Sequence, residues 1–255
     1  MLELLHYCEI RNNIFQDGRF FKANPWGTYQ SKPFAAMSSD TRKEIIMKVS
    51  VIGTGSMGRG FAARLVKAGH SVGLMGRDAA KAAEVAKAVG AAAVGASDAA
   101  KADAIVLAVP YDNAVAALKA LGDLDGVPVI DITNPLTADY MGLTIGHTTS
   151  AAEEIARAVP GALLVKGFNT VFAEVLASGR KAEGGRDVPA FLASDSADAK
   201  AVAAELARSM GFAVVDAGGL GNARYLEALA GLNIYLGYGA GLGTAITPVW
   251  LPLAA

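Results

Sequence analysis

Six residues, Gly53-Thr54-Gly55-Ser56-Met57-Gly58, have the glycine spacing of a turn that binds phosphate groups. An apolar run typical of a strand precedes them, and an Ala-rich stretch with helical spacing follows. In that context the first glycine allows a tight turn, the second lets the backbone approach a pyrophosphate, and the third lets the helix pack on the strand. Free N–H groups at the helix N-terminus attract phosphate. We therefore predict a dinucleotide site; the alternative is a glycine turn without a ligand.

The end of the second predicted strand indicates which dinucleotide binds. Enzymes that use NAD place Asp or Glu there to bind the ribose 2′-hydroxyl, whereas this chain has Gly76 followed by Arg77. A small residue leaves room for a 2′-phosphate, and a guanidinium can bind it through two hydrogen bonds. Lys81 follows one helical turn later. We expect NADP(H). The alternative is that the two cations are solvated and that Asp78, which also suits the N-cap of the next helix, binds the ribose.

Two further segments follow predicted strands and contain proline. Val109-Pro110 ends the fourth strand, and Asn134-Pro135 follows the fifth. Ligands bind at the carboxyl ends of parallel strands in such folds. We expect these residues to border the nicotinamide half of the dinucleotide, with simple strand termination as the alternative.

The remaining titratable residues offer little catalytic chemistry. His147 could bind a carbonyl or a phosphate, but we expect a loop histidine without a catalytic role. Asp131 and Lys166 each end a predicted strand. We expect Asp131 to cap a loop and Lys166, although it could reach a ligand, not to act as a catalytic base. With one cysteine the chain cannot form an internal disulfide, and with three histidines besides we expect no metal site.

The elements that position these residues alternate along the chain from residue 47. Short apolar runs, typical of strands buried on both faces, lie at 49–52, 71–75, 91–94, 104–109 and 127–132. Stretches with helical spacing separate them, at 57–68, 78–89 and 112–121. Further strands are predicted at 162–166, 188–193 and 213–215, and further helices at 149–158 and 197–210. This order predicts an α/β fold, a doubly wound (Rossmann) mostly parallel sheet with a small C-terminal helical cap.

We divide the chain into three parts. Residues 1–46 differ in composition from the rest, and we expect a disordered extension or a wrongly assigned start; the alternative is an arm on a partner surface. Residues 47–160 are the expected NADP-binding core. Residues 161–255 would continue the sheet and form the cap, with the acceptor site and a dimer interface.

Composition excludes several classes of protein. A net charge of −1 gives no basic field for nucleic acid, and 53% hydrophobic residues argue against general disorder. Residues 228–255 carry no charge, which a transmembrane helix would explain. Their glycines and two prolines favour a buried helical segment at a subunit interface or under a ligand. We find no signal sequence and expect a cytoplasmic protein.

The motifs together resemble those of the NADP-dependent oxidoreductases that use the deazaflavin coenzyme F-420. The glycine turn and Gly76-Arg77 with Lys81 carry the resemblance, and it continues in residues 148–154, 165–170 and 187–189. The run Asp216-Ala217-Gly218 to Asn222-Ala223-Arg224 is the most specific part. The similarity covers residue 47 to the C-terminus.

This resemblance implies a homodimeric enzyme that moves a hydride directly between the nicotinamide C4 and the deazaflavin C5. Coenzyme F-420, or FMN or FAD in its place, would be the small-molecule redox partner. The resemblance implies that the turn residues contact the pyrophosphate and that Arg77 and Lys81 bind the 2′-phosphate. Phe168, Asn169 and Thr170 would line the floor between the two rings, and Asn222 and Arg224 would help to hold the acceptor. The same kind of domain occurs in membrane ferric reductases.

Two other functions stay open on the sequence. One is an NADPH-dependent reductase of a small metabolite, although only about 40 residues follow the last predicted strand, fewer than a second domain needs. The other is a module that senses NADP(H) without turnover, because direct transfer between two bound rings leaves no catalytic signature.

Overall fold

The computed structural model describes residues 13–16, 19–22, 46–124 and 126–251. The chain divides into two compact units, residues 1–45 and 46–255. In the first unit, β1 (Asn13–Gln16) and β2 (Arg19–Lys22) pair as an antiparallel hairpin. Most residues of the predicted extension 1–46 lie outside the described part, so that expectation stays a prediction.

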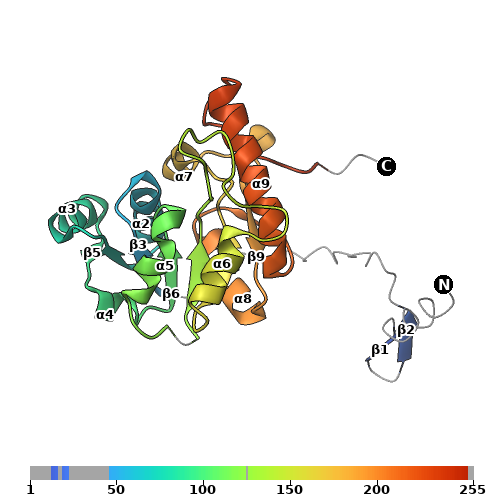
Figure 1. Ribbon diagram of the computed structural model, residues 1–255, viewed down its shortest axis with the longest axis horizontal. Helices are drawn as coiled ribbons and strands as arrows, with labels where there is room; N and C mark the ends of the chain where they lie inside the picture. The colour runs from blue at the N-terminus through green and yellow to red at the C-terminus, as the bar shows by residue number, and fades with distance from the viewer. Residues whose placement is uncertain (1–12, 17–18, 23–45, 125, 252–255) are drawn as a thin grey trace. The chain divides into compact units, whose positions relative to one another are not determined.

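The second unit is built on an eight-stranded sheet (Figure 1). Its strand order is β10-β9-β8-β7-β6-β3-β4-β5. The strands are β3 (Lys48–Ile52), β4 (Ser71–Met75), β5 (Ala92–Ala93), β6 (Ala104–Leu107), β7 (Pro128–Asp131), β8 (Leu163–Gly167), β9 (Pro189–Ala193) and β10 (Ala213–Asp216). Every pair is parallel except β8 with β9. The predicted doubly wound, mostly parallel sheet is therefore confirmed, with β6 ending at Leu107 rather than at Val109.

Helices cover both faces of the sheet because side chains alternate along each strand. Val49 and Val51 of β3 enter one core with α2 (Ser56–Lys67), α3 (Ala79–Val89), α7 (Ala173–Ser178) and α8 (Ala197–Ser209). Ile52 enters the other core with α4 (Ala96–Ala99), α5 (Tyr111–Lys119) and α6 (Ala151–Ala158). The sequence did not predict α7, a short helix that packs on α2.

The sheet reverses direction after β8, and this reversal decides what reaches its carboxyl edge. Since β9 and β10 run opposite to β8, the chain leaves β10 heading away from that edge. It then turns through a short 3-10 helix, η2 (Leu220–Asn222), into α9 (Ala223–Ile234). The end of α9 and the π-helical turn η3 (Tyr235–Gly239) therefore reach the edge, while the start of α9 does not.

The predicted C-terminal helical cap is thus α9 with η3 (Figure 1). In the described part of the chain, no helix is long and apolar enough to cross a membrane.

Candidate functional site

Each glycine of the predicted turn meets different surroundings. Gly53 has φ +128°, and a Cβ there would lie 2.1 Å from the carbonyl oxygen of Ala108. A Cβ on Gly58 would lie 2.0 Å from the carbonyl oxygen of Gly53. A Cβ on Gly55 would meet nothing within 4 Å. The first and third glycines therefore close the turn against the protein, whereas the second leaves open space.

The helix that begins at this turn has free donors. Gly55 is the N-cap of α2 and provides no side-chain hydrogen bond, and the first turn of α2 contains no acidic residue. The first N–H groups of a helix have no intrahelical partners, and the dipole is positive there. The open space at Gly55 and these donors fit the pyrophosphate of a dinucleotide, so the residues present suit NADP(H).

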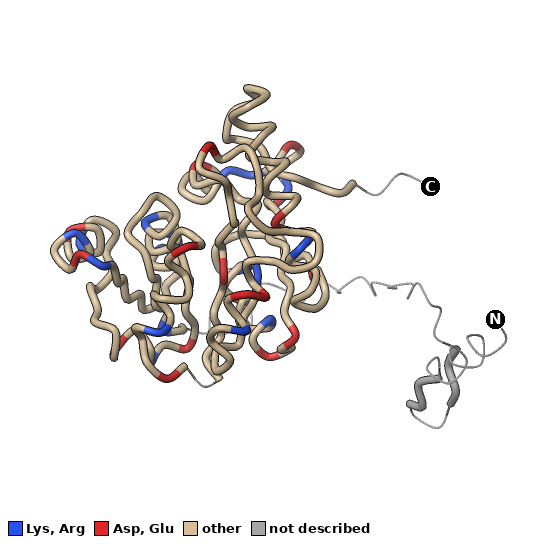
Figure 2. The backbone as a smooth tube through the Cα atoms, viewed as in Figure 1, with Lys and Arg blue, Asp and Glu red and all other residues tan. Residues whose placement is uncertain are grey.

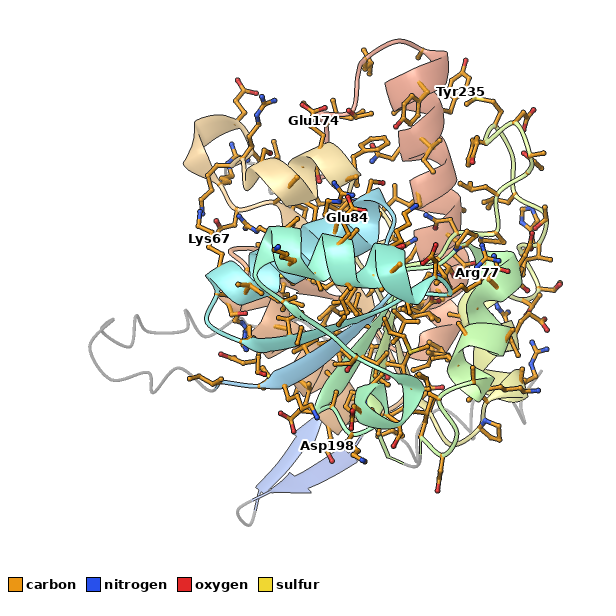
Figure 3. The ribbon with its side chains drawn as sticks, turned by 90° about the vertical axis from the view of Figure 1, so that its left-hand side faces the viewer. Lys67, Arg77, Glu84, Glu174, Asp198 and Tyr235 are labelled. Carbon is orange, nitrogen blue, oxygen red and sulfur yellow. The ribbon has the colours of Figure 1, made fainter. Side chains whose placement is uncertain are left out.

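The position that would carry an acidic residue in an NAD enzyme is Gly76, which lies close against the Thr54 side chain. A Cβ on Gly76 would lie 2.7 Å from the Cγ2 atom of Thr54. Arg77 lies next to the start of α3 (Figure 3) and lines a cavity of about 550 Å³ with the glycine turn and Pro110. Asp78 is the N-cap of α3, since its Oδ1 accepts from the backbone N–H of Lys81 at 3.0 Å.

The cations of this region line two cavities. Lys81 does not share the cavity of Arg77; it lines a neighbouring one of about 620 Å³ with Thr54, Gly55 and Ser56. Arg59, one turn into α2, lines that cavity too. Sequence reasoning missed Arg59, although its place within the first turns of α2 was readable.

A cavity of about 530 Å³ lies over the carboxyl ends of β6 and β7. It is lined by predicted residues of the glycine turn (Gly55, Ser56 and Met57) and by the predicted Val109, Pro110 and Asn134. Burial, together with the charge of Glu154, raises the pKa of Tyr111 at this cavity. Pro135 does not line it; the residue is buried, and its carbonyl accepts from the backbone N–H of Thr144 at 2.7 Å.

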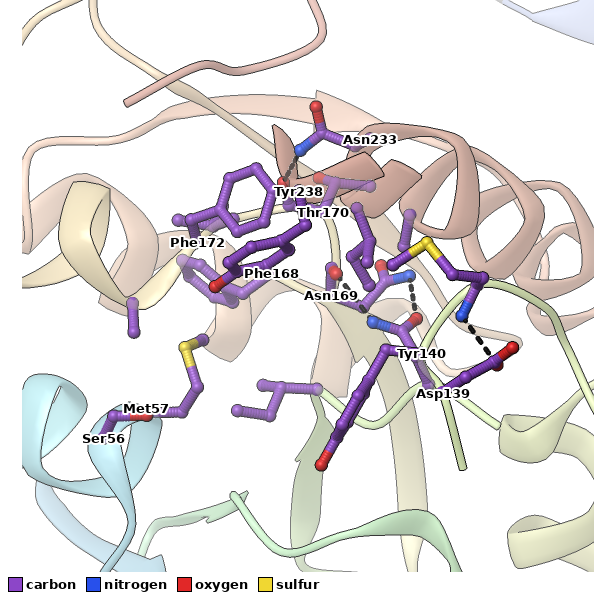
Figure 4. Close-up of a pocket in the computed structure, with 17 residues that line it drawn as sticks. Ser56, Met57, Asp139, Tyr140, Phe168, Asn169, Thr170, Phe172, Asn233 and Tyr238 are labelled. Atoms are coloured by element: carbon purple, nitrogen blue, oxygen red, sulfur yellow. Dashed lines mark hydrogen bonds between the residues drawn. The ribbon is translucent and has the colours of Figure 1, made fainter. Parts of the chain in front are cut away.

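A second cavity, of about 570 Å³, adjoins the first (Figure 4). Four separate segments form it: the start of α2, residues 132–141, residues 168–173 and the end of α9 with η3. Five residues line both cavities, namely Ser56, Met57, Ile132, Asn134 and Tyr140. The two cavities therefore share one wall at the carboxyl edge of the sheet. We name them after the expectations from the sequence: the cavity over β6 and β7 is called the nicotinamide cavity, and the other is called the acceptor cavity.

Amide groups fix the floor of the acceptor cavity. The Asn134 amide donates to the backbone carbonyl of Asn169 at 2.9 Å, and the Asn169 amide donates to Asn134 Oδ1 at 3.0 Å and to the Leu226 carbonyl at 2.8 Å. Asn233 donates to the Thr170 carbonyl at 3.0 Å. The Asn169 Oδ1 and Thr170 Oγ1 atoms are buried and have no protein partner. Such groups are expected to pair with a ligand or with water.

Phe168 begins this floor in an unusual conformation. Its φ is +58°, in the left-handed region that favours glycine, and its side chain is fully buried. Its ring contacts the rings of Phe61 and Phe212 edge to face, with centroids 5.1 and 5.3 Å apart. These contacts hold the chain as it leaves β8 and direct Asn169 and Thr170 to the cavity.

Behind the floor lies a buried ion cluster. Lys166 Nζ is 2.9 Å from Asp131 Oδ2 and 2.8 Å from Glu227 Oε1, and it donates to the Thr133 carbonyl at 2.6 Å. Burial opposes the charge of Lys166, but the two carboxylates outweigh it and raise the pKa of Lys166. Glu227 also accepts from the backbone N–H groups of the first residues of α6. Lys166 is fully buried and joins α9 to the sheet.

Two predicted acceptor residues lie elsewhere. The Asn222 amide donates to the Ala217 carbonyl at 2.6 Å, and Arg224 donates twice to the Glu153 carboxylate, at 2.8 and 2.6 Å. Neither lines the acceptor cavity; the first residue of α9 that does is Ala230, roughly 9 Å beyond Arg224 along the helix axis. The reversed direction of β10 explains this placement. His147 is exposed on the loop before α6 and lines neither cavity.

Comparison with known proteins identifies the family. The family model described as "NADP oxidoreductase coenzyme F420-dependent" matches residues 48–135. The F420-dependent NADP reductase of Methanothermobacter thermautotrophicus is 34% identical over 213 residues, which are 76% of this chain and 90% of that protein. Rat metalloreductase STEAP3 is 31% identical over 71% of this chain, but the aligned region spans only 36% of its length.

A solved structure agrees with these matches. It is described as an F420-dependent NADP reductase from Arthrobacter sp. FB24, with a TM-score of 0.70 and 32% sequence identity. The alignment covers 78% of this chain and 96% of that structure. The resemblance noted in the sequence is therefore confirmed, and the chain belongs to the family of F420-dependent NADP reductases.

Proposed function

We propose that the protein transfers a hydride directly between NADP(H) and a deazaflavin, coenzyme F-420, or a flavin-type acceptor. The observation that carries this proposal is the wall shared by the nicotinamide and acceptor cavities. When bound, the nicotinamide ring supplies the hydride at its C4 atom. Direct transfer needs the two reacting carbons in contact, so the two rings would meet where the cavities adjoin, beside Met57, Ile132 and Tyr140.

The residues at this wall orient ligands and exclude water. Met57 and Ile132 are apolar, and the amide of Asn134 is held by Asn169. Holding two reactants in one geometry removes much of the entropic cost of a reaction between separate molecules. The cavity lining supplies orientation, and we assign no residue as an acid, a base or a nucleophile.

Two features support NADP(H) over NAD(H). Position 76 is a glycine and so lacks the carboxylate that binds an NAD ribose, and a Cβ there would lie only 2.7 Å from the Cγ2 atom of Thr54. Arg77, Lys81 and Arg59 place positive charge around the same turn. We assign the 2′-phosphate to Arg77 and Lys81 and the pyrophosphate to residues 53–58.

The test is oxidation of NADPH by the purified protein with coenzyme F-420, FMN, FAD and a ferric chelate supplied separately. Fast turnover with coenzyme F-420 or with a free flavin supports the proposal and identifies the acceptor. Tight binding of NADPH without turnover with any of these compounds would contradict it.

We also propose that two copies associate through the C-terminal segment. The described residues after Glu227 carry no charge, and the upper end of α9 is tan in Figure 2. Tyr235 projects from that end (Figure 3), and Tyr235, Leu232, Leu242 and Trp250 are each at least half exposed. Exposed apolar groups of this size favour an interface between proteins. Analytical ultracentrifugation should give the mass of a dimer, and a monomer at micromolar concentration would contradict the proposal.

A further inference from the structure

The acceptor cavity has aromatic rings on two opposite sides. Tyr140 lies on the loop between β7 and α6, and Phe172 and Tyr238 lie across the cavity from it (Figure 4). The rings of Phe172 and Tyr238 contact edge to face, with centroids 5.8 Å apart. Stacked aromatic rings attract each other. Two aromatic walls around one cavity therefore suit a flat, conjugated ligand.

Tyr140 is held in place at a cost in backbone strain. Its φ is +63°, and its side chain is 63% exposed. Its N–H donates to the Thr137 carbonyl at 2.9 Å, and Asp139 Oδ1 accepts from the Thr137 hydroxyl and from the N–H of Met141. Non-glycine residues in this region are uncommon and strained, and they cluster at functional sites. The turn presents a large ring at the cavity instead of the glycine that its backbone favours.

Two glycines, one near the end of α9 and one in η3, lie close to this loop. A Cβ on Gly231 would be in ordinary van der Waals contact with the Leu143 side chain, at 3.6 Å. A Cβ on Gly239 would lie 3.4 Å from the Met141 sulfur and 2.8 Å from the Tyr235 ring. The sequence predicted a buried helical segment at a subunit interface or under a ligand here, and in the structure this segment lies beside the loop that carries Tyr140.

Charge cannot supply the affinity of the acceptor cavity. Among its described lining residues there is no Lys or Arg, and the single carboxylate is Asp139. The Thr137 hydroxyl and the Met141 N–H lower the pKa of Asp139, so this carboxylate stays charged at neutral pH. The lining therefore offers a ligand mainly ring faces and uncharged polar groups.

We propose that Tyr140 determines acceptor specificity by stacking a flat, uncharged ring system against the wall of Phe172 and Tyr238. Because Tyr140 also lines the nicotinamide cavity, its ring covers the place where the two cavities meet. The charged tail of an acceptor such as coenzyme F-420 stays outside the cavity. This inference rests on the proposed function, since it names the chemistry of the acceptor for the same site.

The test is the binding of riboflavin, an uncharged flat ring system, to the full chain saturated with NADP+. Quenching of riboflavin fluorescence gives the dissociation constant. The Tyr140→Gly variant removes the ring and relieves the backbone strain, so its melting temperature should stay close to that of the wild type, while its dissociation constant rises at least about fivefold. Tyr140→Phe keeps the ring and should bind within about twofold of the wild type.

Tyr225→Ala is the matched control, because Tyr225 is 74% exposed and lines neither cavity. It should leave riboflavin binding unchanged. Unchanged binding by Tyr140→Gly, or no quenching by the wild-type protein, would overturn the inference. Riboflavin binding that depends on the Tyr140 ring without oxidation of NADPH by any acceptor would instead contradict the proposed function and leave the stacking role intact.

Discussion

Around the glycine turn, space for a ligand is made by residues that have no side chain. Gly55 leaves an opening at the start of α2, and Gly76 places no side chain beside Thr54. On the acceptor side, space is enclosed by large side chains, such as Tyr140 and Tyr238, and by amides that bind one another. Cations line the nucleotide side and are lacking from the described lining of the acceptor cavity.

This difference determines whether a substitution on each side lowers ligand binding or the stability of the whole fold. On the nucleotide side, one short segment, residues 53–58, surrounds the expected pyrophosphate position, so a single methyl group can block it. The acceptor side depends on four segments that the fold brings together, and the Lys166 cluster fixes one of them, α9, to the sheet. We therefore expect global instability from changes to the cluster and local loss of binding from changes to the turn.

The largest effect should follow Lys166→Met. It leaves the carboxylates of Asp131 and Glu227 buried next to each other without a cation. Breaking such a cluster costs roughly 3–5 kcal/mol of unfolding free energy, which urea denaturation will measure. Lys101→Met, at a surface pair that is 65% exposed, should change it by less than about 0.5 kcal/mol. Equal effects of the two substitutions would show that the cluster does not hold the acceptor side together.

The stability lost in Lys166→Met should depend on pH, because the charge of Lys166 is its cause. The pKa of Lys166 is raised in the folded protein. Its contribution to stability is therefore complete below the unfolded pKa of about 10.4 and is lost as the pH rises through the higher folded pKa. The gap in unfolding free energy between wild type and Lys166→Met should therefore shrink above about pH 10.4. A gap that continues to grow above that pH would contradict this assignment.

Two alanine substitutions should separate binding from folding on the nucleotide side. Gly55→Ala adds a methyl group where the protein leaves space, so stability should stay and NADPH affinity should fall roughly 10- to 100-fold. Gly58→Ala pushes a methyl group into the carbonyl of Gly53 and should lower unfolding free energy by about 1–3 kcal/mol. Titration calorimetry measures the affinity for NADPH, and thermal unfolding measures the stability of each variant. Normal NADPH binding by Gly55→Ala would place the pyrophosphate elsewhere.

Arg77→Asp should alter the choice of dinucleotide. The loss of a charge-assisted contact with the 2′-phosphate should weaken NADPH binding roughly tenfold or more and leave NADH binding nearly unchanged. Lys87→Asp, the same charge reversal on the exposed side of α3, is the control. Titration of nucleotide fluorescence gives both constants. If affinity for the two nucleotides falls equally, Arg77 does not bind the 2′-phosphate.

The smallest effect is expected for Arg224→Ala. This residue pairs with Glu153 on α6 and lies away from the acceptor cavity. Its loss should cost about 1 kcal/mol of stability or less and leave the KM for the acceptor unchanged. A rise in that KM without a change in melting temperature would show that Arg224 contacts the acceptor, as the family resemblance implied.

The sequence predicted the nucleotide side because its determinants are local. The glycine spacing, the cap at Asp78 and the cations at positions 77 and 81 all lie within one strand–helix–strand unit. Their geometry follows from adjacent residues, so a single sequence suffices. Arg59 was not predicted as a site residue because it lies after the glycine motif, on the first turns of α2.

The acceptor side could be predicted only in part, since its residues meet through tertiary structure. Asn169 and Thr170 were assigned to the floor between the rings, and they line the cavity as residues next to a strand end. Tyr140, Phe172 and Tyr238 have no pattern that links them across nearly 100 residues. The antiparallel turn at β9, which moves Arg224 away from the edge, depends on sheet pairing that apolar runs do not reveal.

The central claim is direct transfer between two rings that meet at the shared wall, and isotopic labelling tests it most directly. The protein is mixed with NADPH deuterated at the transferring C4 position and with coenzyme F-420 in ordinary water, and the reduced deazaflavin is examined by mass spectrometry. Direct transfer predicts that the deuterium appears on carbon C5 of the deazaflavin, because a hydride passed between carbons does not exchange with solvent. Reduced deazaflavin without deuterium, with the label found in water, would contradict the account.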